Sequence, residues 1–233
     1  KDGWRFNLQA PSLRRALTYL DDASLRETLW RAYATRSTAP GKDNRELLPE
    51  ILRLRRRKAE LLGFRDFSDL VLADRMAGEG QEAQRFVDDF RTRCQEFAAE
   101  DHRTLCAFRK NLDGKEEKFN PWDVAYYAEK LRRDQYDFDE EELRPYFSVD
   151  AALKGAFGVA ERLYGVKVVP HDMPAWDPSV MTFALEDEAE QLLGTFYVDL
   201  YPRENKRGGA WMNALVTRIP GDSQNPHHVG LFC

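Results

Sequence analysis

The hydrophobic pattern of this 233-residue sequence changes its period at Gly165. From about Pro11 to Tyr164, apolar residues recur at the spacing of one helix face. Beyond Gly165, short runs of β-branched and aromatic residues are separated by turns rich in Pro, Asp, Asn and Gly. The pattern predicts an α+β fold that is mainly α, with a helical block over 1–165 and a small, mainly antiparallel sheet over 166–233. Because no repeat or low-complexity linker separates the two parts, we expect one continuous packed unit.

Capping residues mark the ends of the predicted helices. A helix with Leu25, Leu29 and Tyr33 on one face follows Asp21 and Asp22. Either carboxylate can cap this helix, since it accepts hydrogen bonds from the free N–H groups of the first turn. Glycine ends other helices because it adopts the left-handed conformation at little cost. The remaining helices of this kind are predicted over 44–62 before Gly63, 68–76, 81–112 before Asp113-Gly114, and from Ser148 or Asp150 to Tyr164-Gly165.

A further helix is predicted to start at Asn120-Pro121. The asparagine would cap the helix, and the proline would occupy the first helical position, where its missing N–H costs nothing. We expect this helix to direct Val124, Tyr127 and Leu131 inward.

Two of the predicted helices carry apolar stripes that we expect to face the core. The stripes consist of Leu47, Leu48, Ile51, Leu54, Leu61 and Leu62 in the first helix and Phe86, Phe90, Cys94, Phe97, Leu105 and Phe108 in the second. A ligand-binding aromatic stripe is the alternative for the second set. The basic run at 53–58 is interpreted as the solvated face of its helix.

Composition narrows the class of protein. The formal net charge of −5 argues against a general nucleic-acid binder, because phosphate contacts need a basic excess. No stretch approaches the roughly 18 consecutive apolar residues of a membrane-spanning helix. Cys94, Cys106 and Cys233 are an odd set without the pattern of a disulfide scaffold. We therefore expect a soluble, cytoplasmic protein without nucleic-acid or membrane partners.

The sequence contains no recognisable catalytic or metal-binding motif. His102 lies among charged residues of a predicted helix, His171 follows a proline in a loop, and His227-His228 would point to opposite faces of an extended segment. Two histidines at i and i+4 around a glutamate, the motif of many zinc peptidases, are absent, as are glycine-rich phosphate loops. The helical Cys94 and Cys106 have no histidine predicted beside them, so burial in the core is expected for both. We predict no catalytic residue and no metal ligand.

The stretch from Gly194 to Met212 has the pattern of a recognition surface. Its first part alternates with the period of a half-buried strand, and Gly208-Gly209-Ala210 then opens a second strand with almost no side chains. Such an edge can add a peptide as an extra strand. The alternative is a tight turn with a glycine bulge in an ordinary hairpin. The strands of the sheet are predicted over 166–169, 180–185, 192–200, 209–217 and 229–232.

Several long segments closely resemble the M3 family of zinc metallopeptidases, of the oligopeptidase A, thimet oligopeptidase and dipeptidyl carboxypeptidase type. They are FYVDLYPRENKRGGAWM at 196–212, FNPWDVAYYAEKLRR at 119–133, LRPYF at 143–147, LRETLWRAYATR at 25–36 and ILRLRRRKAELLGFRDFSDLVLADRMA at 51–77. The segments occur in the family's order, and the resemblance covers essentially the whole sequence.

The resemblance implies a mostly cytoplasmic enzyme that uses one zinc ion to cleave short peptides in a deep cleft between two largely helical halves. The family's zinc motif is the helix HEFGH, followed later by a glutamate ligand. The ending HHVGLFC resembles the strand that comes shortly before that helix. The sequence also starts without methionine, so we expect a central fragment whose partners are the missing N- and C-terminal parts of the same polypeptide.

Family residues are carried over only where this sequence has matching positions. Gly209, Ala210 and Trp211 match the edge strand that lies antiparallel to bound peptide, and they are the predicted substrate-binding residues. The zinc ligands and the general-base glutamate have no matching positions. The resemblance therefore implies a cleft wall and a substrate-aligning strand that are inactive alone. The alternatives are a peptide-binding module that acts by strand addition and a structural fragment without activity.

Overall fold

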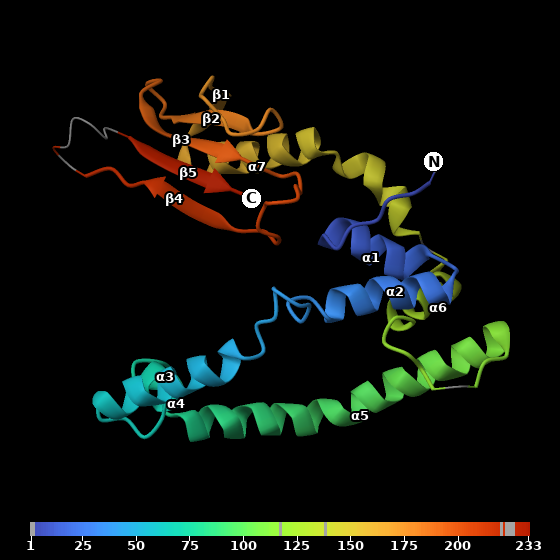
Figure 1. The fold of residues 1–233 in the computed structure, drawn as a ribbon. Coiled ribbons are helices and arrows are strands. Elements are labelled where there is room, and N and C mark those ends of the chain that lie inside the picture. Colours follow the sequence, from blue (N-terminus) through green and yellow to red (C-terminus); the bar gives the residue numbers. More distant parts are fainter. Residues whose placement is uncertain (1–2, 117, 138, 220, 222–226) are drawn as a thin grey trace. The chain divides into compact units, whose positions relative to one another are not determined.

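The computed structural model describes residues 3–116, 118–137, 139–219, 221 and 227–233 (Figure 1). The chain divides into two compact units, Lys1–Asp137 and Phe138–Cys233. The first unit is helical, and the second combines helices with a five-stranded sheet, so the predicted α+β, mainly α class is confirmed. That the helical block and the sheet pack as one continuous unit stays a prediction.

Six helices build the described part of the first unit: α1 (Ala10–Tyr19), α2 (Ala23–Ala34), α3 (Leu47–Leu61), α4 (Phe67–Leu72), α5 (Gly80–Asp113) and α6 (Val124–Tyr136). Helix α1 packs on α2 and α6, α5 packs on α4 and α6, and α3 packs on α4. Among the residues that the structure describes, no helix is both long and apolar enough to cross a lipid bilayer.

Local capping signals place several helix ends. The Asp22 carboxylate accepts hydrogen bonds from the backbone N–H groups of Ser24 (2.8 Å) and Leu25 (3.2 Å), so it caps α2 as predicted. Gly114 after α5 has a φ of +71°, a left-handed value that glycine tolerates and most residues avoid. The predicted glycine stop of α5 is therefore confirmed.

The predicted start of α6 is wrong. Residues 121–123 form a turn, in which the Asp123 N–H donates to the Asn120 carbonyl (3.0 Å), and the helix begins only at Val124. The Asn120 amide donates to the Asp123 carboxylate (3.4 Å), so it is paired with a side chain instead of capping the first helical turn. Of the residues expected to face inward, the structure buries Tyr127, half-buries Leu131 and exposes Val124.

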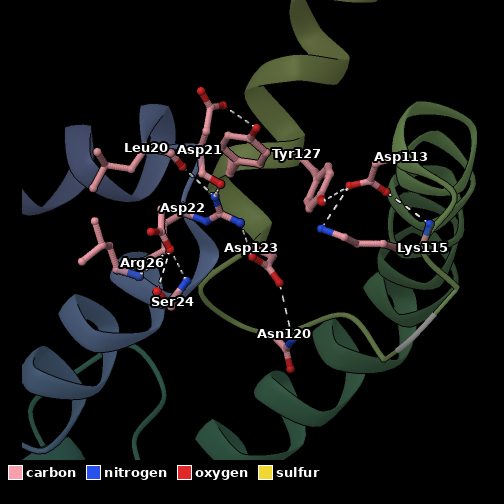
Figure 2. A network of polar contacts seen from close by, with 12 residues as sticks. Leu20, Asp21, Asp22, Ser24, Arg26, Asp113, Lys115, Asn120, Asp123 and Tyr127 are labelled. Carbon is pink, nitrogen blue, oxygen red and sulfur yellow. Dashed lines mark hydrogen bonds and ion pairs between the residues drawn. The ribbon is translucent and has the colours of Figure 1, made fainter.

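A buried arginine joins three helices of the first unit (Figure 2). The Arg26 side chain in α2 is 2% exposed. Its guanidinium donates to the Asp123 carboxylate before α6 (2.5 Å) and to the carbonyls of Leu20 (2.6 Å) and Asp21 (3.0 Å) after α1. Because a buried charge is tolerated only when it is paired and hydrogen-bonded, these contacts fix the helix ends around Arg26.

The two apolar stripes are mostly exposed, contrary to prediction. The six residues of the first stripe, in α3 and at Leu62 directly after it, are 43–68% exposed. In α5, Phe86, Phe90, Cys94 and Phe97 are exposed, while Leu105, Cys106 and Phe108 are half-buried. Within the described residues, α3 packs only against α4, and α5 packs only against α4 and α6. The stripes therefore lack a covering element in this part of the chain.

The second unit contains the 3₁₀ helix η1 (Glu140–Phe147), α7 (Val149–Tyr164) and the strands β1 (Lys167–Pro170), β2 (Met181–Glu186), β3 (Leu192–Val198), β4 (Met212–Val216) and β5 (His228–Phe232). The strand order is β1-β2-β3-β5-β4. Among the described residues of this unit, only the β3–β5 pairing is parallel and the other three pairings are antiparallel, as predicted for a mainly antiparallel sheet. This order places β4 at an edge of the sheet.

Helix α7 covers one face of the sheet. Its Phe157 ring packs against Phe183 of β2 (5.1 Å between centroids) and Phe196 of β3 (6.2 Å). Because successive strand residues point to opposite faces, Tyr197 lies on the other face, where it contacts Trp176 (4.9 Å between centroids). Asp199, two residues after Tyr197, lies on the same face as Tyr197.

Candidate functional site

The three predicted binding residues lie just before β4. The predicted strand start at Gly209 is wrong, because the strand begins at Met212 and Gly209 lies in a bend with a φ of +97°. The Trp211 N–H donates to the Cys233 carbonyl (2.9 Å), and the Cys233 N–H donates to the Trp211 carbonyl (2.8 Å). These two bonds extend the β4–β5 ladder. We call residues 209–211 the edge segment.

The edge segment does not belong to a hairpin between the strands that flank it. Strand β5 separates β3 from β4, so the hairpin alternative is wrong. In an antiparallel ladder, residues with both backbone groups bonded to the partner alternate with residues whose N–H and C=O point away. Since Trp211 is bonded to Cys233, the backbone groups of Ala210 and Met212 point away from β5. Gly209 and Ala210 are exposed.

Asp199, the first residue after β3, carries a buried carboxylate. The Asp199 side chain is 3% exposed and accepts two hydrogen bonds from the Arg203 guanidinium (2.8 and 2.6 Å). It also accepts from the Lys206 ammonium (3.1 Å) and the Trp176 indole (3.1 Å). We call these four residues the Asp199 cluster. The Arg203 guanidinium holds the pKa of Asp199 well below its ordinary value, although burial acts in the opposite direction.

Lys206 closes the loop that leads from β3 to the edge segment. Besides the Asp199 carboxylate, its ammonium donates to the backbone carbonyls of Asp199 (2.5 Å) and Tyr201 (3.2 Å). The three contacts use all three donors of the ammonium group. The Lys206 side chain is 11% exposed, so water competes little for these bonds.

A cavity of about 460 Å³ lies beside the Asp199 cluster, lined by Trp176, Asp199, Arg203, Glu204, Asn205, Lys206, Trp211, Leu231 and Cys233. The Trp211 indole N–H is buried and has no acceptor within the part of the chain that the structure describes. Burial raises the pKa of the Cys233 thiol. The cavity therefore combines an apolar wall, a neutral thiol and a fully paired carboxylate.

The histidines do not assemble a catalytic centre in the described residues. His228 accepts a hydrogen bond at Nδ1 from the Arg218 N–H (3.2 Å). The His102 Nε2 lies 3.6 Å from the Cys106 sulfur on the same helix, a pairing that the sequence analysis missed and that the four-residue spacing could have revealed.

No metal centre is found in the described residues. Over 3–116, 118–137, 139–219, 221 and 227–233, no group of three or more His, Cys, Asp and Glu side chains could hold a metal ion. These residues therefore do not fit the zinc site that the family resemblance implies.

The Asp199 cluster was not predicted as a unit. Asp199, Arg203 and Lys206 were predicted only as parts of the stretch from Gly194 to Met212. The spacing of an acid followed by bases at the fourth and seventh positions was the available signal. That spacing is a weak signal in a loop, because a loop has no regular period that would place Lys206 beside Asp199, and only the folded structure shows this contact.

Comparisons with known proteins identify a family and several relatives. The family model described as "Peptidase family M3" matches residues 16–233. Oligopeptidase A of Escherichia coli (strain K12) is 40% identical over 97% of this chain and 34% of its own length. Probable cytosolic oligopeptidase A of Arabidopsis thaliana is 35% identical over 92% of this chain and 31% of its own length. Dipeptidyl carboxypeptidase of Escherichia coli (strain K12) is 31% identical over 96% of this chain and 33% of its own length.

The chain thus spans about a third of the length of these curated relatives. The family match, in contrast, extends over nearly all of the chain. Together with the predicted fold class and the ordered sequence segments, this match shows that the chain belongs to peptidase family M3.

Proposed function

We propose that this chain is part of a zinc-dependent oligopeptidase that hydrolyses short peptides. Its own contribution is a wall of the cleft, from the helices, and a peptide-aligning edge formed by Gly209, Ala210 and Trp211. The names of the relatives, oligopeptidase A and dipeptidyl carboxypeptidase, support the substrate class. The name "Probable cytosolic oligopeptidase A" supports a cytoplasmic setting.

The observation that carries the proposal is the free backbone at the edge of the sheet. Strand β4 has β5 as its only neighbour in the described sheet, and the N–H and C=O of Ala210 and Met212 point away from it. An extended peptide that lies antiparallel to this edge would bond to these groups. Such bonds do not depend on the peptide's side chains, which suits an enzyme that accepts varied short peptides.

We further propose that the chain does not hydrolyse peptides by itself. The zinc ligands and the general base expected for the family have no counterpart in this sequence, which contains no HExxH motif. They would come from other parts of the same polypeptide. The relatives are about three times as long as this chain, and the exposed apolar residues of α3 and α5 offer surfaces for those parts.

Peptide titration of the isotope-labelled chain tests the edge. We expect a short extended peptide to shift the amide signals of Ala210 and Met212, and to leave those of Lys167, Val168 and Val169 at the opposite edge unchanged. A peptide with the same side chains and N-methylated backbone amides is the matched control, because it cannot donate the main-chain bonds. Equal shifts with both peptides, or no shift at Ala210, would refute the proposed edge.

A separate assay tests the lack of activity. The chain is incubated with zinc and a quenched fluorescent peptide, and an intact family member serves as the positive control. We expect no cleavage above the rate in buffer. Turnover near 1 per second, the lower end of typical enzymes, would refute the claim that other parts of the polypeptide are needed.

A further inference from the structure

The stretch from Lys206 to Trp211, which includes the edge segment, is held at both ends. At one end, Lys206 is bonded to the side chain and the carbonyl of Asp199. At the other end, Trp211 exchanges two backbone hydrogen bonds with Cys233. Only residues 207–210 lie between these two anchors, so the edge segment has little freedom to move independently.

Both anchors rest on the same strand. The Asp199 N–H donates to the Phe232 carbonyl (2.8 Å), and Cys233, the partner of Trp211, is the next residue. The Asp199 carboxylate then binds Arg203 and Lys206, which lie four and seven residues further along the loop. The contacts of Asp199 with Arg203 and Lys206 therefore hold the loop before the edge segment in a defined position relative to β5.

We propose that Asp199, Arg203 and Lys206 are positioning residues that fix the edge segment before a peptide arrives. The inference rests on the proposed peptide-binding function of that segment. A backbone that is already fixed loses less conformational entropy on binding than one that must be ordered by the peptide. The cluster would thus raise the affinity for peptide without touching it.

The small residues of the edge segment explain why contacts from outside the segment are needed to hold it in place. Gly209 and Ala210 carry almost no side chain, and Gly209 has a left-handed φ, so these two residues cannot anchor the edge segment by packing. The Arg207 Cζ lies 5.8 Å from the centroid of the Trp211 ring, but both residues belong to the same short stretch, so this contact does not tie the stretch to the sheet. Besides the two Trp211–Cys233 backbone bonds, the contacts of Lys206 with Asp199 tie this stretch to the sheet.

Lys206→Met tests the inference because it removes the ammonium donors and keeps most of the apolar stem. Lys167→Met in β1 is the matched control, since Lys167 is an exposed lysine at the opposite edge of the same sheet. Lys206→Arg is the conservative variant. The first measurement is hydrogen exchange of the Trp211 amide relative to amides of β3, in the 233-residue chain and well below the unfolding temperature.

We expect Lys206→Met to speed exchange at Trp211 by about tenfold, the factor expected when one residue is no longer held in a single conformation. The β3 amides should change no more than in Lys167→Met. The second measurement is the Kd of the short peptide, which should rise by a similar factor in Lys206→Met, stay unchanged in Lys167→Met and recover largely in Lys206→Arg.

The outcomes separate the two proposals. If the unchanged chain binds no peptide, the proposed function fails, while Trp211 exchange still tests the positioning. If exchange at Trp211 is equal in Lys206→Met and Lys167→Met, the positioning inference is overturned. It is also overturned if exchange rises while the Kd stays constant, because the cluster would then be only structural. If Lys206→Met does not fold, Arg203→Lys, which keeps the charge and loses the paired bonds, replaces it in both measurements.

Discussion

Replacing Asp199 with asparagine should destabilise the second unit strongly. The substitution preserves the side-chain volume, but it removes the charge that Arg203 and Lys206 share and turns an NH₂ group toward one of these donors. Breaking a buried ion pair by removing one partner costs about 3–5 kcal/mol. Lys206 is 11% and Arg203 29% exposed, so both can regain some hydration. We therefore expect the lower end, about 3 kcal/mol.

The assay for Asp199→Asn is denaturant unfolding followed by amide signals of β3 and β5, which report on the second unit alone. Asp172→Asn is the control, because Asp172 is an exposed carboxylate of the same unit and its substitution should cost about 0.5 kcal/mol or less. If Asp199→Asn lies within about 1 kcal/mol of this control, the inference that the cluster is a tightly paired, water-excluding network is wrong.

Measuring the stability of the unchanged chain and of Asp199→Asn at falling pH adds a second readout. The pKa of Asp199 is depressed in the folded chain because Arg203 donates hydrogen bonds to its charged form. A depressed carboxyl pKa contributes its full stability above the unfolded value, near 3.9, and loses it as the pH falls through the folded value. The stability difference between the unchanged chain and Asp199→Asn should be constant from pH 7 to 5 and shrink below about 4. A difference that is equal at pH 4 and pH 2 would contradict this assignment.

Three further predictions concern other parts of the chain. Arg26→Met should destabilise the first unit by about 3–5 kcal/mol in denaturant unfolding, whereas Arg31→Met, which removes an exposed ion pair on the same helix, should cost about 1 kcal/mol or less; equal losses would refute the role of burial. Gly209→Ala should lower the stability by about 1 kcal/mol because of its left-handed φ, and Gly155→Ala within α7 should raise it by about 0.5–1 kcal/mol; a stabilising Gly209→Ala would contradict the backbone geometry. In mass-spectrometric mapping at pH 8, iodoacetamide should modify the exposed Cys94 before Cys233, whose pKa is raised by burial; the reverse order would contradict the placement of Cys233.

The sequence predicted best the features that depend on neighbouring residues. The Asp22 cap and the glycine at 114 act within one helical turn, so their residue types are sufficient to locate the ends. The failure at Asn120 has an equally local cause, since its amide pairs with Asp123 three residues later. A capping motif does not reveal which of two nearby polar groups its side chain will choose.

Features that depend on distant residues were predicted less well. The apolar spacing of Phe86 and Phe90 fits a core-facing stripe, but burial requires a second element, and the described part of the chain provides none there. Asp199 is the opposite case, because a polar residue in an alternating strand becomes buried when Trp176, Arg203 and Lys206 close around it. Strand order likewise escaped prediction, as periodicity does not identify the neighbours of a strand.

A ribosome makes β4 before β5, although β5 is the strand on which β4 depends in the sheet. While residues 228–233 are still inside the exit tunnel, β3 already has β2 as a partner, but Trp211 has no carbonyl of Cys233 to bond. Strand β4 therefore gains its partner in the sheet only after β5, which is synthesised later, has become available. During translation, the edge proposed to hold peptides is therefore completed only after the chain beyond it has been synthesised.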